Sequence, residues 1–210
     1  MTTWLIATRS LGKLAELRPM LEQMGVSAMS LDDAGVAVHV DEHAIEGFDT
    51  FEENALAKAR YFAARTGLPC LADDSGLCIV ALDGAPGVRS RRFAEDRGQL
   101  SDADHDEDAA NNDAMLDACW DSGRAPPWQA HFACSAAFSD GTREYVASGR
   151  TDGVITPERD GIGGFGYDPF FSSAELGVSF ARATREVKAA VSHRHRAVAA
   201  LLKQLGSQLP

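Results

Sequence analysis

Two adjacent carboxylates, Asp73 and Asp74, stand with a serine and a glycine inside a long apolar stretch. Residues 69–72 before them and 77–82 after them have the composition of strands, which predicts a break between two strands at the carboxylates. A buried strand accommodates charge only when the charge is paired or binds a metal. Because Asp, Ser and Gly are also ordinary turn residues, this stretch alone predicts either a polar turn or a functional site.

Two lysines elsewhere in the chain have the chemistry to bind phosphate oxygens. Lys13 follows Gly12 in a turn between an apolar segment and a helical pattern, an arrangement that points backbone N–H groups at an anion. Lys58 comes four residues after Asn54, so the two share one face of a predicted helix. Neither signal is specific alone, since most such turns are plain connections and most such faces are solvent-exposed.

The acidic residues suit a magnesium ion. Mg²⁺ takes oxygen ligands and usually shares its coordination shell with substrate phosphates, which fits Asp73, Asp74 and the acids near Glu46. No spacing of Cys and His residues suggests zinc. Nothing in the sequence resembles a nucleophile elbow or a dinucleotide-binding fingerprint.

A glycine-rich segment ends in Phe165-Gly166-Tyr167-Asp168, where aromatic rings could stack on a nucleobase. The polar groups that could bind the edge of such a base are Asp168, Lys188, His193 and Arg194. The alternative is that the aromatic residues form a packed turn.

The elements that position the first of these residues follow from apolar spacing. A strand over residues 3–8 is followed by a helical pattern over residues 14–24. A capping box that starts at Thr50 predicts a second helix, which ends at Gly67. Three alternating valines predict a strand over residues 36–40.

The C-terminal half predicts a helix, a hairpin, a loop and a last helix. The helix covers residues 108–120, and the hairpin joins residues 130–138 to residues 143–148. A glycine-rich irregular loop covers residues 152–166, including the apolar pair in its middle. The last helix has one apolar face, and Ser192 could cap it.

Composition excludes several classes of function. The 210 residues suit one domain, or two lobes that share a sheet. The net charge of -11 argues against a general nucleic-acid or membrane-surface binder, which would show basic patches. Residues 95–113 hold eight acids against one arginine, and we expect a solvated loop there, leading into the helix, in preference to a metal site.

The cysteines and the N-terminus indicate a cytoplasmic protein. Cys70, Cys78, Cys119 and Cys134 show no CxxC spacing, and they are expected to be reduced core residues. The N-terminal apolar run is too short for a signal peptide or a membrane span.

Together these motifs resemble the inosine triphosphate pyrophosphatase family, whose members hydrolyse non-canonical purine nucleoside triphosphates. The matching motifs appear in the family's order and extend over nearly the whole chain. They are Ala7-Thr8 with Gly12-Lys13 and Glu16, residues 50–59, residues 72–77, residues 84–87, residues 165–169, and Lys188 with Ser192-His193-Arg194. Each motif alone is a weak signal, whereas six in order are specific.

The resemblance implies an elongated α/β fold, in which a long mixed β-sheet with flanking helices forms two lobes around a central cleft. Residues 1–210 would make up this single domain, acting as a cytoplasmic homodimer. The implied reaction releases pyrophosphate from dITP, ITP, XTP or dXTP with Mg²⁺ as the cofactor. The implied partner is a purine nucleoside triphosphate, with no nucleic acid or membrane involved.

The resemblance also implies roles for individual residues. Asp74 corresponds to the catalytic acid–base residue, and Asp74 and Glu46 correspond to the metal ligands. Ser75 corresponds to a substrate contact. The triphosphate would be held by Thr8, Arg9, Ser10, Leu11, Gly12 and Lys13, with Asn54 and Lys58 nearby. The nucleoside would be contacted by Phe165, Gly166, Tyr167, Asp168, Lys188, His193 and Arg194.

Two positions depart from the family's pattern. Arg9 and Ser10 stand where the family usually has Gly-Asn, and we expect this change to tune phosphate binding rather than abolish it. The acidic metal ligand before the Thr-Phe-Glu-Glu-Asn run can be Glu46 or Glu42, and we expect it to be Glu46.

In the implied mechanism, Asp74 takes a proton from a water that attacks the α-phosphorus, and the lysines stabilise the developing charge. Selectivity would come from hydrogen bonds to a 6-oxo edge, because a 6-amino group presents donors instead of an acceptor. The alternatives are a Maf-like pyrophosphatase acting on modified pyrimidine nucleotides and a nucleotide-binding regulator without turnover. The Ser-His-Arg motif favours the purine family over the first, and the retained Asp73-Asp74 pair disfavours the second.

Overall fold

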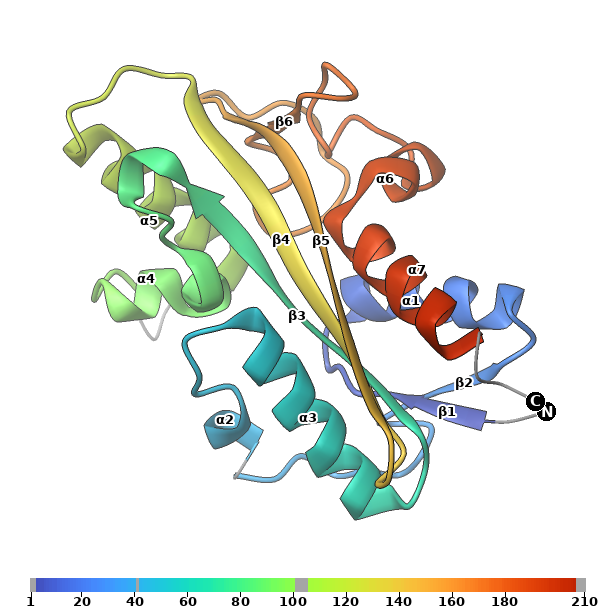
Figure 1. The fold of residues 1–210 in the computed structure, drawn as a ribbon. Coiled ribbons are helices and arrows are strands. Elements are labelled where there is room, and N and C mark those ends of the chain that lie inside the picture. Colours follow the sequence, from blue (N-terminus) through green and yellow to red (C-terminus); the bar gives the residue numbers. More distant parts are fainter. Residues whose placement is uncertain (1–2, 41, 101–105, 207–210) are drawn as a thin grey trace. The chain divides into compact units, whose positions relative to one another are not determined.

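The computed structural model describes residues 3–40, 42–100 and 106–206, which form two compact units. The first unit contains Met1–Asp74, Cys134–Gly149 and His193–Pro210. The second contains Ser75–Ala133 and Arg150–Ser192. Strands β3, β4 and β5 continue from one unit into the other, so each unit is assembled from segments that are distant in the sequence (Figure 1). A cleft between two lobes stays a prediction.

The described residues form a six-stranded sheet with the strand order β2-β1-β3-β4-β5-β6. The strands are β1 (Thr3–Ile6), β2 (Ser27–Ser30), β3 (Cys70–Ile79), β4 (Trp128–Ser139), β5 (Glu144–Ile155) and β6 (Phe171–Ser173). β1 pairs in parallel with β2 and β3, whereas β5 and β6 are antiparallel. This confirms the predicted α/β class with a mixed sheet and flanking helices.

Helices cover both faces of the sheet in the first unit. They are α1 (Leu11–Gln23), α2 (Glu42–Ile45), α3 (Phe51–Thr66) and α7 (His193–Gly206). Neighbouring residues of a strand point to opposite faces, so one strand can supply two cores. Trp4 and Ile6 of β1 pack with α1 and α7, whereas Leu5 packs with α3. The alternation continues in β3, where Leu71 joins the first of these cores and Ala72 the second.

Local signals define the ends of α1 and α3. The side chain of Ser10 accepts a hydrogen bond from the backbone N of Lys13 at 3.3 Å and caps α1. Thr50 Oγ1 accepts from the backbone N of Glu53 at 3.2 Å and donates to Glu53 Oε2 at 2.7 Å, which completes the predicted capping box. Gly67 ends α3 at a φ of 69°, a conformation that glycine adopts at little cost.

The second unit packs its helices on an aromatic core. Its helices are α4 (Phe93–Asp96), α5 (Glu107–Asp121) and α6 (Arg185–Val191), with short 3-10 turns at Val80–Leu82 and Gly87–Arg92. Phe132, Phe171 and Phe180 pack together at the centre, with ring centroids 4.6 to 6.0 Å apart. Gly76 lets β3 pass close to the second 3-10 turn, because a Cβ there would lie 2.2 Å from the carbonyl oxygen of Gly87.

Three expectations about elements are wrong. β3 is continuous, so the two carboxylates lie inside a strand and not at a break. Residues 36–40 are not a strand, and Val38 and Val40 are 72% and 77% exposed. β-Branched residues favour a strand only where a neighbouring strand accepts them, and β2 occupies that place further upstream. β5 runs on to Ile155 because β6 pairs with its end, where the sequence predicts a loop.

The other expectations about elements are confirmed where the structure describes them. The first strand, helices α1, α3, α5 and α7, and the β4–β5 hairpin all form. All four cysteines are free, and three of them are buried. In the acidic segment, Asp106 caps α5, whereas residues 101–105 lie outside the described residues. Across the described ranges, no helix has the length and apolar character to cross a membrane.

Candidate active site

The two carboxylates of β3 are directed to opposite faces of the sheet in the first unit. Asp73 contacts Lys13 on α1 and Arg194 on α7, whereas Asp74 contacts Asn54 on α3. Asp73 is completely buried, and Asp74 is 8% exposed. A strand that buries two negative charges requires a cation or hydrogen-bond donors on each face. Asp73 and Asp74 therefore form a buried polar site and not a surface turn.

Asp73 belongs to a row of four charges that alternate in sign: Glu16, Arg194, Asp73 and Lys13. Asp73 Oδ2 accepts a hydrogen bond from Arg194 Nε at 2.9 Å and lies 3.2 Å from Lys13 Nζ. Arg194 also pairs with Glu16 on α1. Burial alone would raise the pKa of Asp73, but Lys13 and Arg194 outweigh burial and hold that pKa well below its usual range. Asp73 is therefore a permanent carboxylate.

Asp74 has the opposite electrostatic character. Burial raises the pKa of its carboxyl, with a further contribution from Glu46, against the lowering effect of Lys58 and Lys13. Its Oδ2 accepts a hydrogen bond from Asn54 Nδ2 at 2.9 Å. A carboxylate with a raised pKa is a better proton acceptor than an ordinary one, which is what a general base requires.

Asn54 is held in place by the segment before α3. Its Oδ1 accepts from the backbone N of Phe48 at 2.9 Å, and its Nδ2 donates to the backbone O of Phe48 at 3.1 Å. The same Nδ2 group donates to Asp74. Because both ends of the amide are bound, its orientation is determined, and it presents an N–H to Asp74.

Lys58 and Glu46 form an ion pair, and the charges of Asp73 and Asp74 act on it. Burial lowers the pKa of Lys58, but Glu46, Asp73 and Asp74 together raise it above its ordinary value. Burial likewise opposes ionisation of Glu46, and Lys58 and Lys13 more than compensate, so that the pKa of Glu46 is lowered. Three carboxylates and two ammonium groups therefore act on one another as a single cluster.

The donor set of this cluster fits a hard divalent cation that shares its ligands with a substrate. Within the described ranges, Asp73 Oδ1 is a buried oxygen that has no hydrogen-bond partner. The same ranges contain no group of three or more His, Cys, Asp and Glu side chains arranged to hold a metal by themselves. Mg²⁺ usually binds through one or two carboxylates plus phosphates and water, so this set is sufficient for it only when a phosphate is also bound.

The loop before α1 has the geometry of an anion site. The backbone N of Ser10 donates to Thr8 Oγ1 at 3.1 Å, and the side chain of Ser10 caps the helix. Leu11 and Gly12 follow as the first residues of α1, where backbone N–H groups have no helical partner. Lys13, at the next position, adds its ammonium group beside Asp73.

Arg9 of this loop makes contacts that the sequence did not indicate. Its guanidinium pairs with Glu42 through two nitrogens and with Asp32 through a third. Glu42 is therefore engaged by Arg9, whereas Glu46 is the acid that lies with Lys58 in the carboxylate cluster. The choice of Glu46 as a metal ligand stays a prediction.

The second unit holds a buried ion pair among the expected base contacts. Lys188 Nζ donates to Asp168 Oδ2 at 2.6 Å and lies 4.7 Å from the centre of the Phe165 ring. Asp168 Oδ2 also accepts from the backbone N of Phe165 at 2.9 Å. Gly164, at a φ of 74°, allows this turn, because a Cβ there would lie 2.1 Å from Asp168 Oδ2. The pair and the turn hold the Phe165 ring in one place.

Tyr167 is a core residue of the second unit. It is 6% exposed, and its hydroxyl donates to the backbone O of Ser90 at 2.7 Å. Gly166 is bound on both sides, its N by Asp108 Oδ2 at 2.7 Å and its O by Asn112 Nδ2 at 3.1 Å. The structure thus gives Tyr167 the contacts of a packed aromatic turn, whereas the Phe165 side chain is half-buried.

The remaining expected site residues are divided between the units. His193 and Arg194 form the first turn of α7 in the first unit, and both are buried. Ser75 is half-buried on β3 in the second unit. The sequence did not indicate the contact of Glu16 with Arg194, although the spacing of Lys13 and Glu16 on α1 places them on one face. The expected substrate contacts stay predictions.

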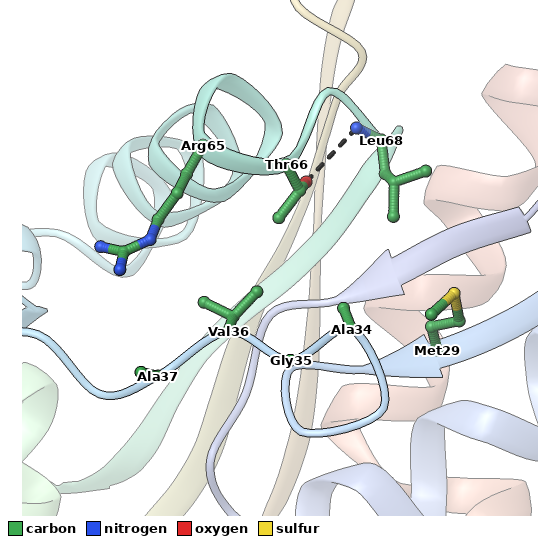
Figure 2. A pocket seen from close by; sticks show the side chains of 8 residues that line it. All are labelled: Met29, Ala34, Gly35, Val36, Ala37, Arg65, Thr66 and Leu68. Atoms are coloured by element: carbon green, nitrogen blue, oxygen red, sulfur yellow. Dashed lines mark hydrogen bonds between the residues drawn. The ribbon is translucent and has the colours of Figure 1, made fainter.

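A separate pocket of about 410 Å³ lies elsewhere in the first unit (Figure 2). It is lined by Met29, Ala34, Gly35, Val36, Ala37, Arg65, Thr66 and Leu68. Arg65 is the one charged residue in this lining, and its Nη1 donates to Tyr61 Oη at 2.9 Å. Because the lining has no carboxylate, this pocket does not have the chemistry of the Asp73–Asp74 cluster.

Nearly the whole chain is similar to known proteins. The model of the family described as "Ham1 family" matches residues 4–204. A protein of Geobacter sulfurreducens named dITP/XTP pyrophosphatase is 42% identical over 99% of this chain and 98% of its own length. A protein of Nocardia farcinica with the same name is 42% identical over 97% of this chain and 94% of its own length.

Solved structures agree with these sequence relatives. The structure of a HAM1 protein from Coxiella burnetii matches with a TM-score of 0.82 and 33% identity, covering 99% of this chain and 100% of that one. A crystal structure of a dITP/XTP pyrophosphatase from Mycobacterium abscessus matches with a TM-score of 0.68 and 40% identity, covering 96% of this chain and 99% of that one. The fold is therefore shared along nearly the full length of the chain.

Proposed function

The chain belongs to the Ham1 family, and from this membership and its carboxylate cluster we infer that it hydrolyses non-canonical purine nucleoside triphosphates, such as dITP and XTP, to the monophosphate and pyrophosphate. The observation that carries this inference is the cluster of Asp73, Asp74 and Glu46 with Lys13 and Lys58. It combines a buried carboxylate of raised pKa with two ammonium groups suited to phosphate oxygens.

The residues of the first unit would have different roles in the reaction. Asp74, oriented by Asn54, would accept the proton of the attacking water. Lys13 and Lys58 would stabilise charge on the phosphoryl oxygens, with backbone N–H groups of the α1 N-terminus as further donors. When bound, Mg²⁺ would offset phosphate charge and lower the pKa of a water, with Asp74 and Glu46 as its protein ligands. Asp73 would remain a carboxylate that keeps Lys13 in place.

Selectivity for the base is assigned to hydrogen bonding at its 6-oxo edge. A site built to donate to an oxo group rejects a 6-amino group, because buried donors are then left opposite other donors. The predicted contacts in the second unit are Phe165, with its ring fixed by Lys188, and the Asp168 carboxylate. In the first unit, His193 and Arg194 are the predicted contacts.

The reaction is tested by product analysis. The purified protein is expected to release pyrophosphate from dITP or XTP and to act poorly on dATP, because the α-phosphorus is attacked and a 6-amino base is rejected. Pyrophosphate and orthophosphate are measured separately across dITP, XTP, dGTP, dATP and dUTP. Orthophosphate as the primary product contradicts the mechanism, and a strong preference for dUTP would favour the Maf-like alternative.

The metal is tested by chelation and by a pair of matched acid variants. Activity is expected to stop with a chelator and return with Mg²⁺, because the cluster offers only hard oxygen ligands. Glu46→Gln is expected to raise the Mg²⁺ concentration for half-maximal rate more than Glu42→Gln does, because Glu46 lies in the cluster and Glu42 binds Arg9. The reverse order would assign the metal ligand to Glu42.

We propose that the protein is a homodimer and that it acts in the cytoplasm, where nucleotide pools are cleansed. Light scattering on the purified protein should give twice the mass of one chain. A monomer with full activity would show that the site needs no second copy.

A further inference from the structure

Arg9 makes a three-point contact that joins two segments of the first unit. Its Nη2 donates to Glu42 Oε1 at 2.9 Å and its Nε to Glu42 Oε2 at 3.2 Å, so the guanidinium and the carboxylate meet as a fork. Its Nη1 donates to Asp32 Oδ1 at 3.2 Å. The side chains of Arg9 and Glu42 are 26% and 14% exposed, which is less than for a typical surface pair.

The two joined segments are the ones that carry the charges of the candidate active site. Arg9 belongs to the loop that ends in Lys13, beside Asp73. Glu42 is the first residue of α2, and Glu46 follows directly after the last residue of that helix. Lys58 holds Glu46 at this second end. The helix between the two carboxylates is thus pinned at its beginning by Arg9 and just past its end by Lys58.

A helix as short as α2 cannot keep its own position. It has four residues, and a single turn of helix is unstable without tertiary contacts. The backbone N of His39 also donates to Glu42 Oε1, at 3.1 Å, so the carboxylate that binds Arg9 also fixes the entry to the helix. Loss of the Arg9 contact would therefore loosen the start of the segment that ends in Glu46, while Lys58 still pairs with Glu46.

We propose that Arg9 is a positioning residue: through Glu42 it fixes α2, and thereby holds Glu46 where it can serve as a metal ligand. The inference rests on the proposed function in that it takes Glu46 as a ligand. Each of the three nitrogens of the guanidinium donates to a carboxylate, and two of these bonds go to Glu42, so the geometry points to an action of Arg9 through Glu42. The residue departs from the family's usual Gly, and its role is structural support of the metal site.

The first test measures amide hydrogen exchange of residues 42–48 in the protein without nucleotide or metal. Arg9→Ala and Glu42→Gln are each expected to speed this exchange by about three- to tenfold, the range for a partly buried charge pair. The double variant should match Arg9→Ala, because that change already removes the contact with Glu42. Arg18→Ala is the matched control, since Arg18 pairs with Asp33 at 2.6 Å in the same region but on the surface, and it should leave the exchange unchanged.

The second test measures pyrophosphate release from dITP as Mg²⁺ is varied. Arg9→Ala is expected to raise the Mg²⁺ concentration for half-maximal rate by about three- to tenfold, with the KM for dITP at saturating Mg²⁺ nearly unchanged. Arg9→Lys should recover part of the effect, because a lysine keeps the charge but not the fork.

A raised KM for dITP at saturating Mg²⁺, with exchange of residues 42–48 unchanged, would make Arg9 a direct phosphate contact and overturn the proposal. Unchanged exchange together with an unchanged Mg²⁺ requirement would overturn it as well. If the wild-type protein did not hydrolyse dITP or XTP, the proposed function would fail, and the exchange measurement would still decide whether Arg9 fixes α2.

Discussion

Asp74→Asn is expected to lower the rate of pyrophosphate release by about two to four orders of magnitude, the range for a lost general base. Asparagine has nearly the same shape and its carbonyl can still accept from Asn54, so the hydrogen bond at 2.9 Å has a replacement. It cannot accept a proton and is a poorer ligand for Mg²⁺. Turnover at saturating substrate and Mg²⁺, with nucleotide affinity measured separately, gives the effect.

The melting temperature of the same variant shows whether Asp74 serves the reaction or the stability of the fold. The pKa of Asp74 is raised in the folded protein, mainly by burial, so above this pKa the ionised carboxylate is less favourable in the folded state than in the unfolded state. Asp74→Asn should therefore melt at or above the wild-type temperature at neutral pH. Asp121→Asn, on an exposed side chain of α5, is the control and should change neither property. Full turnover in Asp74→Asn would show that Asp74 is not the general base.

Much of the fold could be predicted because local signals and burial agree. The capping box at Thr50 and the left-handed Gly67 bound α3 in the sequence and in the structure alike. The continuity of β3 could not be predicted, since nothing local shows that helices on both faces supply Arg194 and Asn54 to the adjacent carboxylates. The polar residues looked like a turn because their partners are distant in the sequence.

The sequence indicated which residues belong to the candidate site more completely than it indicated which contacts they make. Asp74, Lys58 and Glu46 come together as expected. The contact of Arg9 with phosphate stays a prediction. Its contact with Glu42 could not be predicted, because the two residues are 33 positions apart, a distance over which sequence spacing carries no information. Tyr167 illustrates the same limit, because its burial against Ser90 depends on how two distant segments pack.

Arg194→Met is expected to destabilise the protein by about 3–5 kcal/mol, because it removes the buried cation that pairs with Asp73 and Glu16 and leaves Asp73 with Lys13 alone. Arg194 is 2% exposed and pairs with both Asp73 and Glu16. For a chain of this size, a loss of that magnitude lowers the melting temperature by roughly 6–20 °C. Thermal and urea unfolding, without nucleotide or metal, measure the effect independently of any role of Arg194 in substrate binding.

The matched control is Arg60, an exposed arginine that makes a bidentate contact with a carboxylate. Arg60 donates to both oxygens of Glu144 at 2.6 Å, but the two side chains are 56% and 36% exposed. Arg60→Met should therefore cost no more than about 1 kcal/mol, as surface pairs do. Arg194→Lys should fall between the two, because one ammonium cannot reproduce the fork that serves Asp73 and Glu16.

Because the stability lost in Arg194→Met comes from the lost pairing of Asp73 and Glu16, removing one of these carboxylates in the same protein should restore part of that stability. Asp73→Asn is expected to destabilise the wild-type protein, where it breaks the contacts to Arg194 and Lys13, by more than it destabilises Arg194→Met. The coupling follows from unfolding free energies of the two single variants and the double variant. If the two changes were simply additive, the charge row would contribute through packing alone, and Asp73 would not depend on Arg194 for its charge.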